Sequence, residues 1–84
     1  MIDSTDADIA IRELTLLLAY LTSWREKPEP MSRAWKGYSF DVLDELQEQG
    51  LIEQSKAAKS LYITPEGETR AKELLAKYGI EADA

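Results

Sequence analysis

The chain has 84 residues, of which 16 are acidic and 10 are basic, so its formal net charge is −6 with no histidine to adjust it. This length provides for one small domain, residues 1–84, with a single hydrophobic core. The absence of cysteine and histidine excludes disulfides, thiolate nucleophiles and metal sites built on these ligands. Hydrophobic residues make up 44% of the chain, which predicts a folded globule rather than a disordered segment.

The start of the chain and its apolar runs bear on location. The first eight residues carry three aspartates and no basic residue, the opposite of the basic start of a signal peptide. The longest apolar run, residues 16–21, is far shorter than the ~18 residues that a membrane span needs. We therefore expect a cytoplasmic protein with no membrane partner.

Residues 6–25 predict a long first helix, with Asp6 and Asp8 at the positive end of the helix dipole. With residues placed at 100° intervals, the apolar arc of this helix spans roughly 220°, about twice the stripe of an ordinary surface helix. Large exposed apolar patches mark interfaces, so we expect a homodimer formed through this helix. The alternative is that the rest of the chain wraps around it. The self-association candidates are Ile11, Leu14, Leu18, Leu21 and Trp24.

Residues 26–38 form a linker between the first and second predicted helices. Pro28 and Pro30 disfavour helix in their neighbours, and Gly37 ends whatever short turn precedes it. Trp35 has a large apolar ring, whose exposure to water is unfavourable, so we expect it to pack on the core.

Residues 39–49 predict a second helix, with Ser39 as its N-cap. One side of this helix is apolar, and the other carries the carboxylates Asp41, Asp44, Glu45 and Glu48. Gly50 is placed to close the helix in a left-handed conformation, which lets Leu51 fold back onto Leu46.

Residues 51–63 predict a β-hairpin with strands at 51–54 and 60–63, and residues 64–78 predict the last helix. Thr64 is its expected N-cap, Pro65 takes the first helical position and Gly79 ends it. The tail, residues 81–84, is expected to fray. The predicted core consists of Leu14, Leu17, Leu21, Trp24, Trp35, Phe40, Leu43, Leu46, Ile52, Leu61, Ile63, Leu74, Leu75 and Tyr78.

Two motifs carry a resemblance to a known fold. Gly50-Leu51-Ile52 follows the second helix, and Ile63-Thr64-Pro65-Glu66-Gly67 opens the last one. The order resembles the winged-helix domain of bacterial transcription regulators, in which a helix ending in Gly-Leu-Ile precedes a wing and the closing helix opens with Leu-Thr-x-x-Gly. The resemblance covers residues 39–78 and implies a mainly α fold with three principal helices and a two-stranded wing. One departure is that a full winged helix has another helix before residue 39.

A second resemblance covers most of the chain. Arg33-Ala34-Trp35-Lys36-Gly37, together with Phe40-Asp41-Val42-Leu43, resembles a small bacterial family of uncharacterised single-domain proteins. That resemblance implies no activity.

Charge is the second departure from the regulators, whose helix corresponding to residues 40–49 enters the DNA major groove. Residues 40–53 carry five acids and no base, so this stretch repels phosphates, whereas DNA affinity rests largely on lysine and arginine. Nucleic acid is therefore disfavoured as a partner. As an alternative, a DNA-binding transcriptional regulator could use linker and wing bases, Arg33, Lys36, Lys56 and Lys59.

Enzymatic chemistry has little support. Asp41 with Glu45, and Asp44 with Glu48, stand one helical turn apart, as acid pairs or metal ligands do, but four carboxylates on one helix side are typical of a solvated surface. We expect no catalytic residues, no metal and no cofactor. The sequence favours a non-enzymatic protein-interaction module that self-associates and offers the acidic surface to a basic protein partner, whose identity is unknown.

Overall fold

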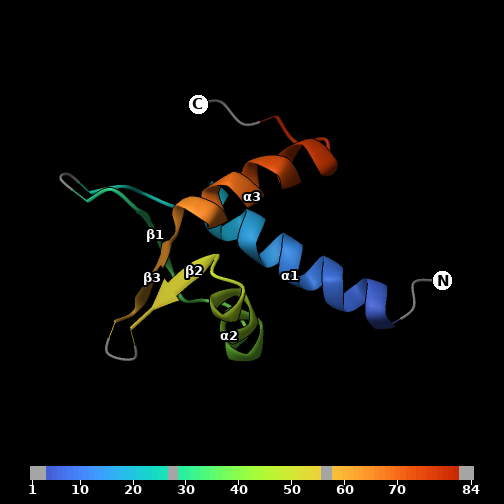
Figure 1. Ribbon diagram of the computed structural model, residues 1–84, viewed down its shortest axis with the longest axis horizontal. Coiled ribbons are helices and arrows are strands. Elements are labelled where there is room, and N and C mark those ends of the chain that lie inside the picture. Colours follow the sequence, from blue (N-terminus) through green and yellow to red (C-terminus); the bar gives the residue numbers. More distant parts are fainter. Residues whose placement is uncertain (1–3, 27–28, 56–57, 82–84) are drawn as a thin grey trace.

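The computed structural model describes residues 4–26, 29–55 and 58–81. Within these ranges the elements are, in chain order, α1 (Ser4–Leu21), β1 (Ser32–Trp35), α2 (Phe40–Glu48), β2 (Ile52–Gln54), β3 (Ser60–Ile63) and α3 (Pro65–Lys77). The strands form an antiparallel sheet in the order β1-β3-β2. The sheet lies at one end of the molecule, and α1 runs away from it with α3 above and α2 below (Figure 1). The expectation of a mainly helical fold with a β-hairpin is confirmed.

α1 begins two residues before and ends four residues before the predicted range 6–25. Its early end has a local cause, because the hydroxyls of Thr22 and Ser23 donate hydrogen bonds back to the carbonyls of Leu18 and Tyr20, at 2.9 and 2.6 Å. Trp24 then leaves the helix and pairs with Arg33 in an antiparallel bridge.

The linker contains a strand that the sequence did not predict. β1 pairs with β3 in the register Ser32↔Ile63 to Trp35↔Ser60, so the predicted two-stranded wing is part of a three-stranded sheet. Ala34 in β1 is fully buried, and this small residue lies close beside the core. The prediction failed because the prolines before residue 31 indicated an irregular segment, and this strand is too short to show a clear alternation.

The helix ends agree with the predicted caps. Gly50 and Gly79 have positive φ values of 77° and 66°. In each case the next residue donates its N–H back into the helix, Leu51 to Leu46 O at 3.0 Å and Ile80 to Leu75 O at 2.9 Å. Thr64 caps α3 as predicted and accepts from Gly67 N–H, with Pro65 as the first helical residue. Ser39 holds the N-cap position of α2, but its side chain makes no capping bond.

The core is built from one side of each helix and from the sheet. Half of the predicted core is confirmed as buried: Leu17, Leu43, Leu46, Ile52, Leu61, Ile63 and Leu74. Trp24, Leu75 and Tyr78 are partly buried. Leu16, Ala19, Ala34 and Ala71 are buried as well, although the predicted core omitted them.

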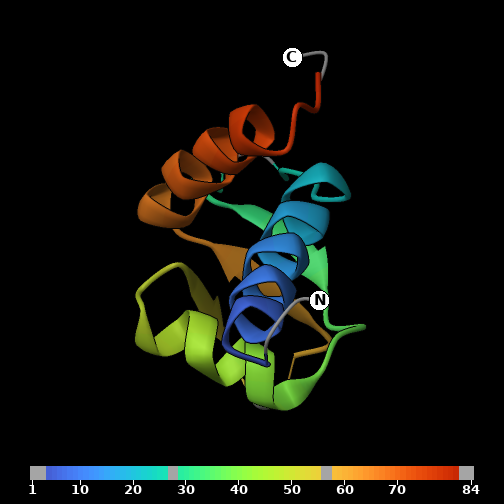
Figure 2. The same ribbon diagram turned by 90° about the vertical axis from the view of Figure 1, so that its right-hand side faces the viewer.

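Four predicted core residues are exposed, and each has a geometric reason. In the backbone, α2 and α3 lie on the same side of α1 (Figure 2), and Leu14 and Leu21, 46% and 43% exposed, are on the part of α1 that these helices leave open. Trp35 is 64% exposed because side chains alternate along β1, so that burying Ala34 turns Trp35 outward. Phe40, 72% exposed, lies one turn before Asp44 on the polar side of α2.

Candidate interaction surface

Four aliphatic side chains form a stripe on the outer side of α1. Ile11, Leu14, Leu18 and Leu21 are between 43% and 50% exposed, and their spacing of three and four residues places them on one side of the helix. These are four of the five self-association candidates. We call this set the α1 stripe.

A hollow accompanies the α1 stripe. Leu14, Leu17, Leu18 and Leu21 line it together with Ile80, and its volume is about 260 Å³. Ile80 reaches this position because the turn after α3 folds the chain back at Gly79, and it is itself 38% exposed. The hollow is therefore lined by aliphatic side chains alone, from α1 and from the segment that follows α3.

Trp24, the fifth candidate, lies apart from the stripe. It follows the end of α1 and packs on Trp35, with ring centroids 4.9 Å apart and planes inclined by 40°. Its indole N–H donates to Glu26 Oε1 at 3.1 Å. Trp24 thus belongs to an aromatic pair at the edge of the sheet rather than to the α1 stripe.

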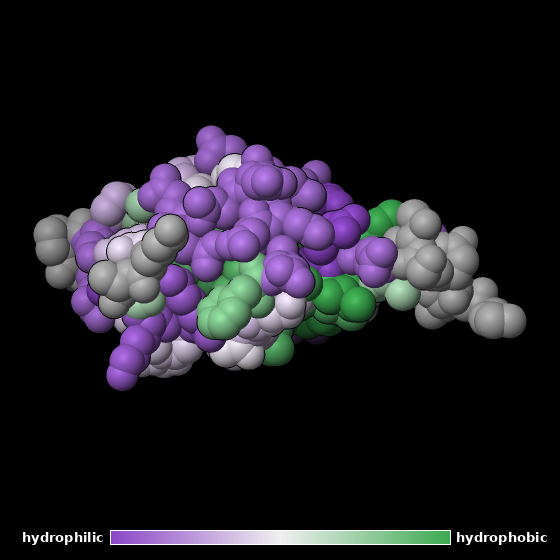
Figure 3. Space-filling model, turned by 90° about the horizontal axis from the view of Figure 1, so that it is seen from below, coloured by the Kyte–Doolittle hydropathy of each residue, from purple (hydrophilic) through white to green (hydrophobic). Residues whose placement is uncertain are grey.

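The predicted acidic surface is present on α2, where Asp41, Asp44, Glu45 and Glu48 are all exposed. Glu45 forms an ion pair with Arg12 of α1 at 2.9 Å, and Asp44 accepts a hydrogen bond from Gln54 at 3.2 Å. From the side on which α2 lies, hydrophilic atoms cover a broad area, and hydrophobic atoms gather beside them toward the end where α1 runs (Figure 3).

The basic residues considered for nucleic acid are largely engaged within the protein. Arg33 donates to Ser60 Oγ at 2.8 Å, lies 3.7 Å from Glu26 and 3.9 Å from Glu29, and stacks over the ring of Tyr62. These partners hold its guanidinium against the sheet.

Among the lysines considered for nucleic acid, Lys36 donates to the Ser55 carbonyl, and Lys59 is exposed. Lys56 lies outside the described residues. Lys36 and Lys59 lie beside each other, since the Lys36 N–H donates to the Lys59 carbonyl at 3.1 Å.

Glu13 is a buried carboxylate that the sequence analysis did not single out. Its side chain is 10% exposed and accepts hydrogen bonds from Arg70 at 2.8 Å, Lys77 at 2.7 Å and the hydroxyl of Tyr78 at 2.9 Å. One signal was available in the sequence, because an acid within the apolar arc of a helix requires partners if it is buried. Those partners come from the last helix and its cap.

The surroundings of Glu13 shift two pKa values. The hydrogen bond from Lys77 lowers the pKa of the Glu13 carboxyl, assisted by the bond from Tyr78 and the charges of Lys77 and Arg70, and these effects outweigh burial, which acts in the opposite sense. The same contact raises the pKa of Tyr78, because its proton is held by the Glu13 carboxylate. The cluster thus fastens α1 to α3 in the charged state of Glu13.

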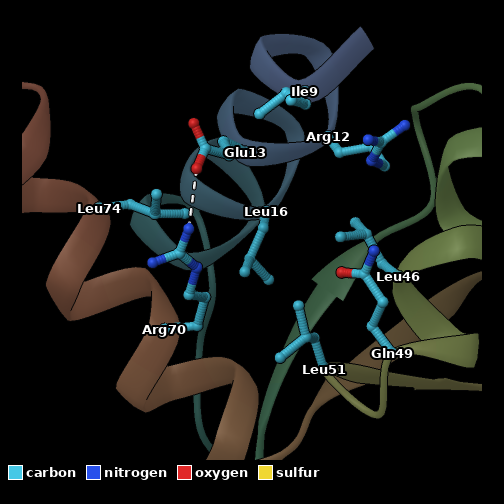
Figure 4. Close-up of a pocket in the computed structure, with 9 residues that line it drawn as sticks. All are labelled: Ile9, Arg12, Glu13, Leu16, Leu46, Gln49, Leu51, Arg70 and Leu74. Atoms are coloured by element: carbon cyan, nitrogen blue, oxygen red, sulfur yellow. Dashed lines mark hydrogen bonds and ion pairs between the residues drawn. The ribbon is translucent and has the colours of Figure 1, made fainter. Parts of the chain in front are cut away.

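A cavity of about 160 Å³ lies beside Glu13, between α1, α2 and α3 (Figure 4). Its charged lining residues are already paired, Arg12 with Glu45 and Arg70 with Glu13. The charged side chains around the cavity are therefore used in ion pairs between helices. No group in the cavity lining points to a ligand.

Residues 4–26, 29–55 and 58–81 contain neither a metal-binding cluster nor a membrane-spanning helix. Within them, no cluster of three or more carboxylates is arranged to hold a metal ion. In the same ranges, no helix has both the length and the hydropathy needed to cross a bilayer.

Comparison with known proteins adds a family but no activity. Searches of the curated proteins and of the solved structures gave no match. The model of one family, described as a domain of unknown function (DUF6429), matches residues 7–81, which include every strand, α2, α3 and all but the first turn of α1. The chain therefore belongs to the DUF6429 family.

Proposed function

We propose that this protein is a non-enzymatic protein-interaction module that self-associates as a homodimer through α1. The α1 stripe carries the proposal, because four neighbouring aliphatic side chains are about half exposed on one side of a helix whose opposite side packs into the core through Leu16 and Leu17. Burial of apolar area contributes roughly 25 cal/mol per Å², so this surface gains from contact with a similar one. Contiguous exposed apolar surface in a soluble domain is typical of an interface.

The size of the α1 stripe limits the strength of the dimer. A patch of a few hundred Å² is smaller than the roughly 800 Å² that each partner buries in a standard interface. Association also costs translational and rotational freedom, which a small interface offsets poorly. We therefore expect a reversible dimer that forms at concentrations on the order of micromolar to tens of micromolar.

Sedimentation velocity over a concentration series tests the proposal. The wild-type chain should shift from monomer to dimer, and Leu18→Gln should move the midpoint to at least several-fold higher concentration. Ile9→Gln is the matched control, because Ile9 is 41% exposed on the same helix but lines the cavity beside Glu13 rather than the stripe. A wild-type chain that stays monomeric at hundreds of micromolar would refute self-association.

We also propose that the acidic surface of α2 binds a basic protein partner. Asp41, Asp44 and Glu48 are exposed beside the ring of Phe40, which offers an apolar contact next to the charges. Opposite charge steers a partner toward such a surface and is weakened by salt.

A lysine-rich peptide with interspersed leucines, followed by fluorescence anisotropy, probes this second proposal. Asp44→Asn with Glu48→Gln should weaken binding several-fold, whereas Glu66→Gln with Glu73→Gln, which removes two exposed carboxylates from α3, should have little effect. Equal weakening by both changes would show attraction to net charge alone and would remove the specific role of α2.

The finer fold assignment, a winged-helix-like domain, is likewise a proposal. It is supported by the order of α2, the β2-β3 hairpin and α3, with the glycine and threonine of the two motifs at the helix ends. The further helix that a full winged helix has before α2 is replaced by β1 and its flanking residues. The cytoplasmic location expected from the sequence also stays a prediction.

The alternative function, DNA binding through linker and wing bases, has a direct test. Anisotropy titration with duplex DNA at low ionic strength should show no binding, because phosphate attraction is greatest there and the charge of −6 opposes it. Binding that is lost in Lys36→Ala or Lys59→Ala would instead support the DNA-binding alternative.

A further inference from the structure

We propose that the two α1 helices of the homodimer pack antiparallel, with the partner's Leu14 inserted into the hollow formed by Leu14, Leu17, Leu18 and Leu21. This inference rests on the proposed self-association and specifies its geometry. Three independent observations carry it: the spacing of the stripe, the shape of the hollow and the distribution of charge along α1.

The stripe has the spacing of a coiled-coil seam. Together with Ala7, its residues recur at intervals of four, three, four and three, which is the alternation of a and d positions in a heptad. Ile11 and Leu18 take one kind of position, and Ala7, Leu14 and Leu21 take the other. A second helix with the same spacing fits this seam at a crossing angle of about 20°.

The hollow has the form of the hole that receives a side chain in such packing. A knob from one helix enters a space bounded by four residues of the other, at i, i+3, i+4 and i+7. Leu14, Leu17, Leu18 and Leu21 stand at these four positions, and the volume of about 260 Å³ has an aliphatic lining. Ile80 closes one side of the hollow, so the chain after α3 adds to the contact.

Charge selects the orientation. Asp6 and Asp8 lie in the first turns of α1. Parallel helices would place the aspartates of both copies together and align the two helix dipoles, which is unfavourable. Antiparallel helices separate the aspartates of the two copies and set the two helix dipoles in opposite directions.

These constraints define a register. A two-fold axis near residue 16 pairs Leu14 with the partner's Leu18, and Ile11 with the partner's Leu21. It also places the partner's Leu14 at the level of the hollow, and the symmetric contact repeats on the other side. The two copies of Ile11 are then separated by ten residues along the helix axes, or about 15 Å.

Disulfide trapping tests the register cleanly, because the chain contains no cysteine. Ile11→Cys and Leu21→Cys are prepared singly and mixed before mild oxidation, and the covalent dimer is measured on a non-reducing gel. The mixture should yield at least several-fold more covalent dimer than either variant alone. A disulfide requires Cα atoms within about 7 Å. With cysteine at positions 11 and 21, this register brings position 11 near position 21 of the partner, but neither position near its own copy.

The outcomes separate the geometry from self-association itself. Efficient cross-linking of Ile11→Cys alone would show parallel helices or an antiparallel pair with another register, and either would overturn the inference while leaving the dimer in place. Absence of the mixed disulfide in a preparation that sediments as a dimer would also overturn it. A preparation that sediments as a monomer would remove the proposed function together with the inference.

Two controls accompany the experiment. Ile9→Cys mixed with Leu21→Cys should give only background cross-linking, because Ile9 faces the cavity beside Glu13. Thermal melting by circular dichroism checks that each variant is folded, which is expected because the substituted residues of the stripe are about half exposed.

Discussion

Gly67 lies directly against the backbone carbonyl of Leu51. A Cβ atom at position 67 would come 1.9 Å from the Leu51 oxygen, which no side chain can do without moving the backbone. Thr64 reinforces the approach, since its N–H donates to the same oxygen at 3.1 Å and its hydroxyl accepts from Gly67 N–H at 2.9 Å. The start of α3 is thereby held on the turn that leads from α2 into β2.

Gly67→Ala should therefore lower the free energy of unfolding by about 2 kcal/mol or more, because overpacking forces the backbone apart. This loss runs against the intrinsic preference of helices for alanine over glycine, worth about 1 kcal/mol. Urea unfolding followed by circular dichroism measures the change. Gly37→Ala is the control, because no atom lies within 4 Å of its built Cβ, and its effect should stay below about 1 kcal/mol. Equal effects of the two substitutions would contradict the close approach.

Leu74→Ala should lower the free energy of unfolding by roughly 2–5 kcal/mol, because Leu74 is fully buried on α3 and its removal leaves a cavity in the core. That loss is a large part of the stability of a domain this small. Thermal melting of the variant measures it. Leu18→Ala, at a half-exposed position, should cost clearly less when both are measured below the concentration of dimer formation.

Glu13→Gln should destabilise the protein near neutral pH, and the loss should shrink on acidification. The pKa of Glu13 is lowered in the folded state, chiefly by the hydrogen bond from Lys77, so its contribution to stability is full above the ordinary glutamate value of about 4.3. The contribution disappears as pH falls through the folded-state pKa. Denaturant unfolding of both proteins between pH 7 and pH 3 measures this; a difference that grows on acidification would contradict the assignment.

Glu45→Gln should change the free energy of unfolding by less than about 1 kcal/mol, because its ion pair with Arg12 is solvent-exposed, with Glu45 48% and Arg12 28% accessible. The same change should weaken binding of the basic peptide to α2. Urea unfolding and peptide anisotropy on one preparation give both values. A large loss of stability would show that Glu45 serves mainly to stabilise the fold through its ion pair with Arg12 rather than to bind a partner.

Features encoded by neighbouring residues could be predicted from the sequence. Thr64 followed by Pro65, and Gly79 followed by Ile80, define the ends of α3 through bonds that span only a few residues. The acidic surface of α2 follows from helical spacing in the same way. Such features depend on local backbone geometry, which composition and spacing describe well.

Features that depend on distant residues could not be predicted. The partners of Glu13 lie 57 to 65 residues away, and β1 becomes a strand only because β3 lies beside it. Trp35 and Phe40 were wrongly predicted to be buried because hydrophobicity alone does not tell which side of a strand or helix meets the core. The α1 stripe was predicted from the width of the apolar arc, but which part of that arc stays open depends on where α2 and α3 pack.

The central position of β3 has a consequence for synthesis of the chain. β1 and β2 both need β3 as their neighbour, yet β3 begins at Ser60, in the last third of the chain. While the ribosome is still making earlier residues, neither strand has its partner and the inner side of α1 has no α3 to cover it. The tertiary structure can therefore form only after β3 and α3 have been made, and a chain truncated before Ile63 would leave two strand edges and the apolar inner side of α1 open to other nascent chains.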